Sequence, residues 1–206
     1  MLYSSDIDKS RNCPQCGDAL EIYFKYSKLI KCRSCGSSIF LEDETVKRIG
    51  ESSVLSSEPS LIQLHQLFTY KKKTYLPLGK IRYSYGRGFW EEWFLKDKNN
   101  KEYWLSIDEG DFVLQEKMQP SLPFKTSHQF KVGNTYNTYL VTEKGQGRCV
   151  GFEGELPEEI YFGKVHVYIH LSQGLGNLVT VEFTDTLTET FKGKWIDPLK
   201  IEVLNR

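Results

Sequence analysis

Four cysteines near the N-terminus constrain the fold more than any other feature of this 206-residue chain. They form two Cys-x2-Cys pairs, Cys13 with Cys16 and Cys32 with Cys35, in the segment CPQCGDALEIYFKYSKLIKCRSCG. Two residues between paired cysteines let a tight turn direct both sulfurs to one point, and a glycine follows each pair where the chain must reverse. Two such turns facing each other complete a tetrahedral thiolate site, so the sequence predicts a Zn²⁺-binding zinc ribbon over residues 1–41.

Other uses of these four cysteines fit the sequence less well. Two disulfides would need an oxidising compartment, and a redox Cys-x2-Cys motif usually stands alone near a βαβ pattern, which is absent here. Four thiolates leave no open position for substrate or water, so we expect the metal to be structural and to replace a core that so short a segment cannot build. The fifth cysteine, Cys149 in GRCVGF, has no partner motif and is expected to be a small buried residue.

The composition favours strands over helices. The chain has 12 Tyr, 12 Phe and 16 Gly but only 2 Met, which is typical of a protein built from strands and turns. The 27 basic and 27 acidic residues balance, which argues against a surface tuned as a whole for nucleic acid or anionic membrane. No stretch approaches the ~18 apolar residues of a membrane helix, and the start lacks the apolar region of a secretory signal. We therefore expect a soluble, cytoplasmic protein.

The chain divides into three parts by composition. Residues 42–60 are polar and serine-rich and are interpreted as a linker. The segment SLIQLHQLF that follows fits either a short helix or an extended segment, and His65 within it is expected to be packed or solvated rather than a ligand. Residues 61–206 alternate between strand and turn patterns, which predicts an antiparallel barrel-like or sandwich β domain in two β units, 61–119 and 124–206. Because a linker would separate two cores, chelation of zinc is expected to unfold the first ~40 residues and to spare the β domain.

Two segments of the β domain carry specific expectations. TYNTYLVTEKGQGRCVGF is interpreted as a hairpin around residues 144–147, where two glycines occur. In KVHVYIHL, apolar and polar residues alternate, so His166 and His170 share one face of a strand. They would lie ~13 Å apart, too far to share a metal ion, and an outward polar face is the better interpretation.

The segment FWEEWFLKDKNNKEYWL, residues 89–105, supports a specific hairpin. If KDKNNK is the turn, the register brings together an aromatic pair, an opposite-charge pair and an apolar pair, each contributing roughly 0.2–1 kcal/mol. A one-residue slip would destroy all of them. The predicted cross-strand pairs are Leu95 with Tyr103, Trp93 with Leu105, Glu91 with Ile107, Lys96 with Glu102, Phe94 with Trp104, and Glu92 with Ser106.

The two adjacent glutamates in this hairpin invite a catalytic interpretation that strand geometry opposes. On a strand, Glu91 and Glu92 point to opposite faces, so they cannot act together on one substrate. Glu92 falls in an aromatic neighbourhood with Trp90 and Trp104, and if buried there it needs a donor, such as the Arg82 guanidinium or a backbone N–H.

Several motifs occur together in a recognisable order. CPQCG and CRSCG are followed by GKIRY, WEEW, YWL, YLVTEKGQGRCVGFEGELP, VTVEF and TFKGKWI. In this order the sequence resembles the bacterial domain-of-unknown-function family 4178, in the variant with an N-terminal zinc ribbon. That family's recurring pieces match residues 79–83, 90–93, 104–105 and 154–157 here.

The resemblance implies a mainly β protein with no established catalysis, and it supplies no catalytic residues to transfer. Genes of the family tend to lie near those for membrane-stress proteins and polyamine metabolism. Some relatives carry transmembrane helices, and their absence from this sequence weakens a carry-over of direct membrane association.

Three functions follow from these observations, and the first is a non-enzymatic protein-binding or adaptor module, in membrane-stress or polyamine-linked systems if the resemblance holds. A ribbon joined to an aromatic-rich β domain offers flat surfaces and edge strands for a partner protein. The sequence contains no nucleophile elbow, Walker loop, HExxH motif or dinucleotide fingerprint, so an enzyme is not expected.

The alternatives concern charged ligands. Residues 70–90 hold six basic residues and no acid among several aromatic rings, a pattern that fits nucleic acid, together with the ribbon. Glu92 and Glu155, with the nearby tryptophans, would instead suit a polyamine or another cationic small molecule. The candidate binding residues are Trp90, Glu92, Trp93, Trp104, Glu155, Lys71, Lys72, Lys73, Arg82 and Arg87.

Overall fold

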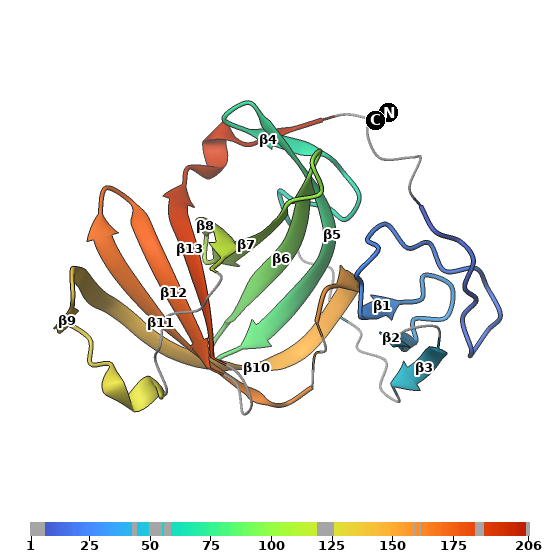
Figure 1. Cartoon of the computed structure of the whole chain (residues 1–206), viewed down its shortest axis with the longest axis horizontal. Helices are drawn as coiled ribbons and strands as arrows, with labels where there is room; N and C mark the ends of the chain where they lie inside the picture. The colour runs from blue at the N-terminus through green and yellow to red at the C-terminus, as the bar shows by residue number, and fades with distance from the viewer. Residues whose placement is uncertain are drawn as a thin grey trace.

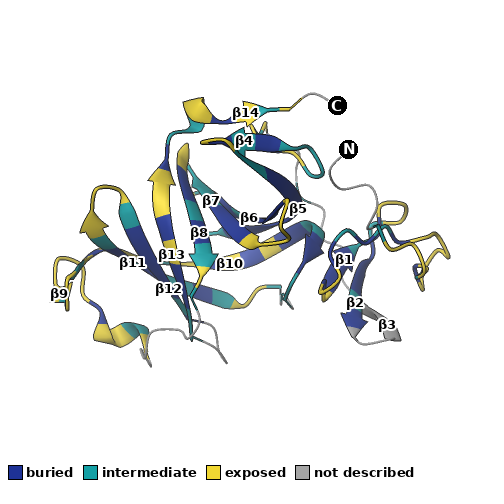
Figure 2. Cartoon of the chain, turned by 45° about the horizontal axis from the view of Figure 1, so that its top comes forward, coloured by how far each residue is buried: buried dark blue, intermediate teal, exposed yellow. Residues whose placement is uncertain are grey.

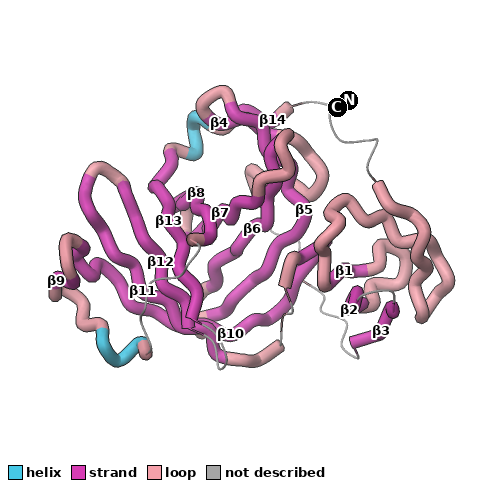
Figure 3. Tube along the Cα trace, viewed as in Figure 1, coloured by secondary structure: helices cyan, strands magenta, loops and turns pink. Residues whose placement is uncertain are grey.

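The structure, a computed structural model, is built from antiparallel strands. It describes residues 7–42, 45–49, 55, 59–118, 126–158, 160, 162–183 and 188–204. In this part of the chain the only helices are two short 3-10 turns, η1 (Ser127–Gln129) and η2 (Pro198–Lys200) (Figure 3). The strands are β1 (Leu29–Lys31), β2 (Ser38–Glu42), β3 (Thr45–Ile49), β4 (Phe68–Tyr70), β5 (Lys73–Ser84), β6 (Phe89–Asp97), β7 (Glu102–Asp108), β8 (Asp111–Lys117), β9 (Thr135–Tyr136), β10 (Tyr139–Leu156), β11 (Val165–Gly174), β12 (Asn177–Phe183), β13 (Thr188–Ile196) and β14 (Glu202–Val203).

Eight of these strands form a ring in the order β5-β6-β7-β8-β13-β12-β11-β10. Strand β10 closes the ring because its residues 140–148 pair with β11 and its residues 148–154 pair with β5 (Figure 1). All neighbouring pairs are antiparallel. The predicted mainly β, barrel-like class is confirmed.

The two predicted β units interlock within this ring. Strand β8 of the first unit pairs with β13 of the second, and β5 pairs with β10. The segment SLIQLHQLF contains no helix; it runs into β4, which pairs with β5 on one side and β14 on the other. Here His65 is packed, with its ring stacked on Tyr23 at 4.3 Å between centroids.

Strand β10 corrects one sequence-based expectation. It is a single strand of 18 residues, so residues 144–147 form no hairpin turn. The glycines there serve close packing instead: a Cβ on Gly145 would lie 2.4 Å from the Tyr168 ring, and one on Gly147 would lie 2.3 Å from the Trp90 ring. Because glycine has no side chain, the Tyr168 and Trp90 rings inside the barrel can pack directly against the backbone of β10 at these positions.

The two faces of β11 also differ from expectation. His166 and His170 point into the barrel rather than outward, and both line an internal cavity. The opposite, apolar face packs in a cluster with Phe130 and Val141, so it is buried from outside (Figure 2). Alternation predicted two distinct faces correctly, but which face is internal depends on what covers the other one.

The hairpin of β6 and β7 has the predicted register at all six positions. Glu91 and Glu92 therefore point to opposite faces of the sheet, as predicted. On the inner side, Phe94 and Trp104 pack with an apolar cluster that fills one end of the barrel, together with Ile81 and Phe152. On the outer side, residues of β6, β7, β8 and β13 pack beneath the segment around β4.

The cysteine-containing segment packs directly on the barrel. Strand β1 pairs with the end of β10, and both Phe24 and Leu29 belong to the apolar cluster of the barrel. The carboxylate of Glu155 on β10 accepts hydrogen bonds from three donors in this segment: the N–H groups of Tyr23 (2.8 Å) and Phe24 (3.0 Å), and the Ser27 hydroxyl (2.8 Å).

The predicted linker, residues 42–60, contains one strand. Residues 45–49 form β3, which pairs with β2, while most of the remaining linker lies outside the described residues. The proline-rich connection at residues 119–125 also lies outside them. No helix in the described part of the chain has the length and apolar character needed to cross a membrane.

Candidate functional site

The four N-terminal cysteines converge as their spacing predicts. Their sulfur atoms all lie within 4.8 Å of one another, and the Sγ atoms of Cys13 and Cys35 are 3.6 Å apart. Those of Cys16 and Cys32 are 3.7 Å apart, and none of the described cysteines forms a disulfide. Four sulfurs at ~2.3 Å from a tetrahedral ion would lie about 3.8 Å from one another, so the donor set fits a thiolate-bound metal. In this candidate metal site, the four cysteine sulfurs would fill all four coordination positions of a tetrahedral ion.

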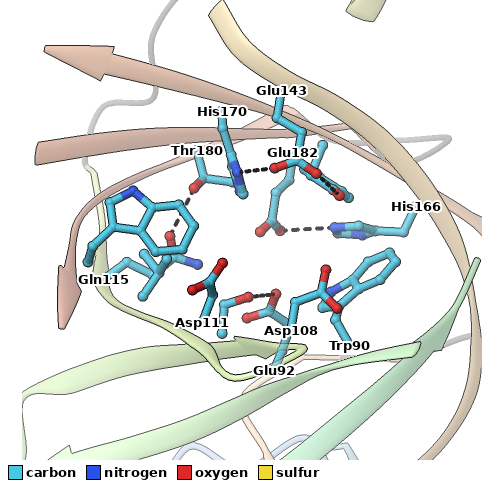
Figure 4. A pocket seen from close by; sticks show the side chains of 14 residues that line it. Trp90, Glu92, Asp108, Asp111, Gln115, Glu143, His166, His170, Thr180 and Glu182 are labelled. Atoms are coloured by element: carbon cyan, nitrogen blue, oxygen red, sulfur yellow. Dashed lines mark hydrogen bonds and ion pairs between the residues drawn. The ribbon is translucent and has the colours of Figure 1, made fainter. Parts of the chain in front are cut away.

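A second candidate site lies inside the barrel, at the end opposite the cysteine-containing segment. It is a cavity of about 80 Å³ surrounded by side chains from strands on all sides of the ring (Figure 4). Five carboxyl side chains line it, and none of the described lining residues is lysine or arginine. The five are Glu92, Asp108, Asp111, Glu143 and Glu182.

Burial distinguishes the floor of the cavity from its rim. Gln115 and Thr180 on the floor are buried and bonded to each other, with the Thr180 hydroxyl donating to Gln115 Oε1 at 3.0 Å. Asp111, Glu143 and Trp195 on the rim are exposed, and Trp195 is 43% exposed. The cavity therefore opens to solvent on the side of these three residues.

Glu92 is the lining residue whose charge is least compensated. Its Oε1 accepts a hydrogen bond from the Ser106 hydroxyl at 2.9 Å. Its Oε2 is shielded from solvent and, within the described part of the chain, makes no hydrogen bond. Burial raises the pKa of this carboxyl to about 8, against smaller lowering effects of the Ser106 hydroxyl and of the neighbouring Trp90 indole. A carboxylate with so few donors is costly to bury, and a proton or a cation would relieve that cost.

Glu182 on β12 is a second strongly perturbed acid across the ring. Burial raises its pKa well above the ordinary value, and repulsion from Glu92 raises it further. Its Oε2 lies 3.5 Å from Nε2 of His166, whose own pKa burial lowers to about 4. Burial thus favours the protonated form of both carboxyls and the neutral form of the His166 imidazole.

Glu143, a third acid at the rim of the cavity, has hydrogen-bonding partners for both of its oxygens. Glu143 accepts a hydrogen bond from the Tyr168 hydroxyl at 2.6 Å, and its other oxygen lies 3.1 Å from Nδ1 of His170. The hydrogen bond to His170 lowers the pKa of Glu143, so this carboxyl is ionised at neutral pH. The cavity thus has an acid of lowered pKa at its mouth and acids of raised pKa deeper inside.

Aromatic rings complete the wall on the Trp90 side. Trp90 stacks on Tyr83 at 4.9 Å between centroids and meets the edge of Tyr168 at 5.3 Å. His166 lies 6.3 Å from the same indole. Because these rings hold one another, Trp90 presents a fixed face to the acidic cavity.

The structure separates the candidate residues that the sequence grouped together. Trp90 and Glu92 line the cavity, whereas Trp104 packs below them in the apolar cluster. Trp93 is buried on the opposite face of β6, where its Nε1 donates to Glu91 Oε2 at 3.1 Å.

Arg82 is not the donor to Glu92 that the sequence offered. It is the cross-strand neighbour of Glu91, and its Nη2 lies 2.7 Å from Glu91 Oε1, with its Nε at 3.1 Å. Lys80 adds a second cation 3.4 Å from the same oxygen. The strand alternation that places Glu91 beside Arg82 necessarily takes Glu92 away from it.

The remaining candidates lie elsewhere. Glu155 is buried at the junction with the cysteine-containing segment, so it does not share a pocket with Glu92. Lys71, Lys72 and Lys73 lie at the turn and start of β5, whereas Arg87 is exposed in the turn after its far end. A 12-residue strand separates them by about 40 Å, so the basic stretch does not form one patch.

Most of the lining residues escaped the sequence-based candidates, among them Glu182, His166, Glu143 and Trp195. One signal could have found the first two, because both belong to alternating strands with polar residues on one face. A polar face that turns inward is typical of small barrels with an internal site.

Comparison with known proteins places the barrel, but not the cysteines, in a family. Residues 63–198, more than half of the chain, match the family described as Domain of unknown function (DUF4178). The chain belongs to this family. All lining residues of the internal cavity fall within the DUF4178 match, and the four cysteines precede it. No curated protein and no solved structure matches the chain.

Proposed function

We propose that the DUF4178 barrel of this protein binds a small organic cation, a primary amine or the amine end of a polyamine, in its acid-lined cavity. The observation that carries the proposal is Glu92: a carboxyl shielded from solvent, with Oε2 making no hydrogen bond among the described residues, in a lining without lysine or arginine. An ammonium group beside Glu92 would supply the missing donor and the missing charge at once.

The electrostatics of the cavity favour a cation over a neutral ligand. Burial first, and then repulsion from other acids, raises both pKa values: Glu158 and Asp108 act on Glu92, and Glu92 and Glu158 act on Glu182. A cation between them would stabilise both carboxylates and release their protons. The Trp90 ring adds an aromatic face that favours the same charge, by roughly 0.5–2 kcal/mol.

Size restricts the ligand further. A cavity of about 80 Å³ has room for several water molecules or for an ammonium group and its first carbons. A longer amine would extend past the exposed rim at Asp111 and Glu143, where Glu143 is ionised. This arrangement supports a linear diamine or polyamine more than a bulky quaternary ammonium ion.

Isothermal titration calorimetry of the full chain with putrescine, spermidine and n-butylamine at pH 7 and pH 8.5 tests the proposal. We expect all three to bind, n-butanol not to bind, and affinity to rise with pH until the deep carboxyls are ionised. Titrations in two buffers of different ionisation enthalpy should reveal proton release on binding.

Two variants and a control sharpen the test. Glu92→Gln and Glu182→Gln should each weaken amine binding by roughly tenfold or more, because each removes a buried charge beside the ligand. Glu202→Gln changes an exposed glutamate on β14 and should leave binding unchanged. Equal affinity for n-butylamine and n-butanol, or no effect of Glu92→Gln, would refute the proposal.

For the cysteine cluster we propose structural Zn²⁺. The supporting observation is four sulfurs at tetrahedral spacing with no disulfide among the described cysteines. One zinc per chain is expected by elemental analysis. Because Phe24 and Leu29 of this segment pack in the barrel core, chelation should lower the melting temperature of the whole chain, in contrast to the sequence-based expectation that the β domain is spared.

The adaptor function, a protein partner and the cytoplasmic location are untested and stay predictions. Pull-down of the full chain from its native host would test the first two. Cell fractionation would test the third.

A further inference from the structure

The mouth of the internal cavity carries its own group of acids, apart from those deeper inside. Asp108 and Asp111 are cross-strand partners on either side of the tight turn at residues 109–110, and Glu143 approaches from β10 across the ring (Figure 4). Asp111 and Glu143 are exposed. Like charges directly opposite each other destabilise a strand pair, so a cation at the mouth would relieve this one.

The acids at the mouth influence one another and have few donors. Burial raises the pKa of Asp108, and repulsion from three neighbouring acids raises it further: Glu109, Glu143 and Asp111. The Tyr85 hydroxyl lies 3.4 Å from Asp108 Oδ1. Within the described part of the chain, neither Asp108 nor Asp111 forms an ion pair, and no lysine or arginine lines the cavity. The negative charge at the mouth is therefore uncompensated.

A metal ion shared by the acids at the mouth does not fit their spacing. Among the described residues, only the four cysteines bring three or more ligand atoms within 4.8 Å of one another. An ammonium group needs no such convergence, because its three N–H donors can each reach a different acceptor. The mouth therefore suits an organic cation.

Aromatic rings hold Glu143 and extend the wall beside it. The Tyr168 hydroxyl donates to one of its oxygens at 2.6 Å, and Nδ1 of His170 lies 3.1 Å from the other. The exposed Trp195 ring meets His170 edge-on, at 6.3 Å between centroids. Trp195 lies on the inner face of β13, because its cross-strand partner Val113 also lines the cavity. The indole thus stands beside the acids, where its face favours a cation.

The deeper acid lies one strand step from the mouth. Glu92 accepts a hydrogen bond from Ser106, and Asp108 follows on the same face of β7, two residues along. Same-face neighbours on a strand lie ~7 Å apart, which is about the reach of an extended diamine with four or five methylene groups. Independently of the mouth, Oε2 of Glu92 is shielded from solvent and makes no hydrogen bond among the described residues, which points to one ammonium group there.

We infer that the mouth is a second ammonium site and that the ligand is a linear diamine. One ammonium group lies beside Glu92. The other lies between the Asp108–Asp111 pair and Glu143, against the Trp195 ring. The inference rests on the proposed amine binding and adds the second charge of the ligand, its chain length and the residues that select for both.

Calorimetry of the full chain at pH 7 tests the second site with matched ligands. Putrescine is compared with 4-amino-1-butanol, the same chain with a hydroxyl in place of the second ammonium group. We expect putrescine to bind roughly tenfold tighter or more, and 1,3-diaminopropane, too short to reach both sites, to show little of this gain. Equal affinity for putrescine and 4-amino-1-butanol, or a full gain with 1,3-diaminopropane, would overturn the inference and leave amine binding itself intact.

Variants at the mouth should change the ratio of the two affinities. Asp111→Asn should weaken putrescine roughly fivefold or more and leave 4-amino-1-butanol within about twofold. Trp195→Ala should also reduce the advantage of putrescine, and Trp195→Phe should restore most of it. Glu109→Gln removes an exposed charge from the same turn outside the lining, and should leave both affinities within about twofold. Equal losses in Asp111→Asn and Glu109→Gln would indicate general attraction to acids and overturn the site.

Glu92→Gln separates failure of the second site from failure of amine binding. This variant acts on the deep ammonium group, so it should weaken putrescine and 4-amino-1-butanol by the same factor and leave their ratio unchanged. If neither amine binds, or if Glu92→Gln changes neither affinity, the proposed amine binding is refuted and the second site with it.

Discussion

Each face of β6 carries a glutamate with little or no contact with solvent, but the two carboxyl groups have opposite surroundings. On the outer face, the Glu91 carboxylate accepts hydrogen bonds from Arg82, Lys80 and the indole N–H of Trp93, all with donor–acceptor distances within 3.4 Å. On the inner face, Glu92 receives the Ser106 hydroxyl and lies in a lining of other acids.

The difference teaches that adjacency in sequence does not imply a shared role. A buried carboxylate stays ionised where cations and N–H donors surround it, and it holds a proton where they are missing. Glu155 is an intermediate case, because three neutral donors contact it and burial still raises its pKa to about 7. These contacts indicate structural support for Glu91 and Glu155, whereas Glu92 is the residue that we propose binds the amine.

The largest change in the free energy of unfolding is expected from replacing Glu91 on the outer face of β6. Glu91→Ala leaves Arg82 and Lys80 buried without this carboxylate, and we expect a loss of about 3–5 kcal/mol in the free energy of unfolding. Urea denaturation monitored by tryptophan fluorescence measures it. Glu202→Ala, at an exposed site, should stay within about 0.5 kcal/mol of the unchanged protein. Similar losses of stability in Glu91→Ala and Glu202→Ala would contradict the structural role of Glu91.

An intermediate effect is expected at Glu155. Glu155→Ala leaves the N–H groups of Tyr23 and Phe24 and the Ser27 hydroxyl without their acceptor, and should cost about 1–3 kcal/mol. The same denaturation experiment applies, and exchange of the Tyr23 and Phe24 amide hydrogens should accelerate. If exchange stayed slow in the variant, the carboxylate would not be what anchors this segment.

The smallest change in the free energy of unfolding, an increase rather than a loss, is expected from replacing Glu92. The folded-state pKa of about 8 lies above the ordinary value, so the contribution of Glu92 to stability is complete at acid pH and is lost as pH rises through 8. Glu92→Gln should therefore raise the free energy of unfolding by about 1–2 kcal/mol at pH 8.5 and change little near pH 5. A pH series of urea melts checks this, and a loss of stability at pH 8.5 would place Glu92 with Glu91 as a structural residue.

Much of the local structure could be predicted from particular residues. Cross-strand matching over residues 89–107 specified six of the seven pairs of the β6–β7 hairpin, because a slip would have separated all its complementary side chains. The spacing of the cysteines specified their convergence. The hairpin at residues 144–147 was wrong because glycine marks both turns and close ring contacts, and only the positions of Trp90 and Tyr168 distinguish the two.

The candidate site was predictable only in part. Trp90 and Glu92 were selected for their residue types, whereas Glu182 and His166 reach them from β12 and β11 on another side of the ring.

The sequence by itself determined the β class, the four-cysteine cluster, the β6–β7 register and the divergence of Glu91 from Glu92. The tertiary structure alone decided which face of each strand turned inward and which distant acids met there. The physical reason is that strand alternation, a local property, defines two faces without assigning them. Ring closure through β10, and the apolar residues that cover the outer surfaces, assign the acidic face to the interior.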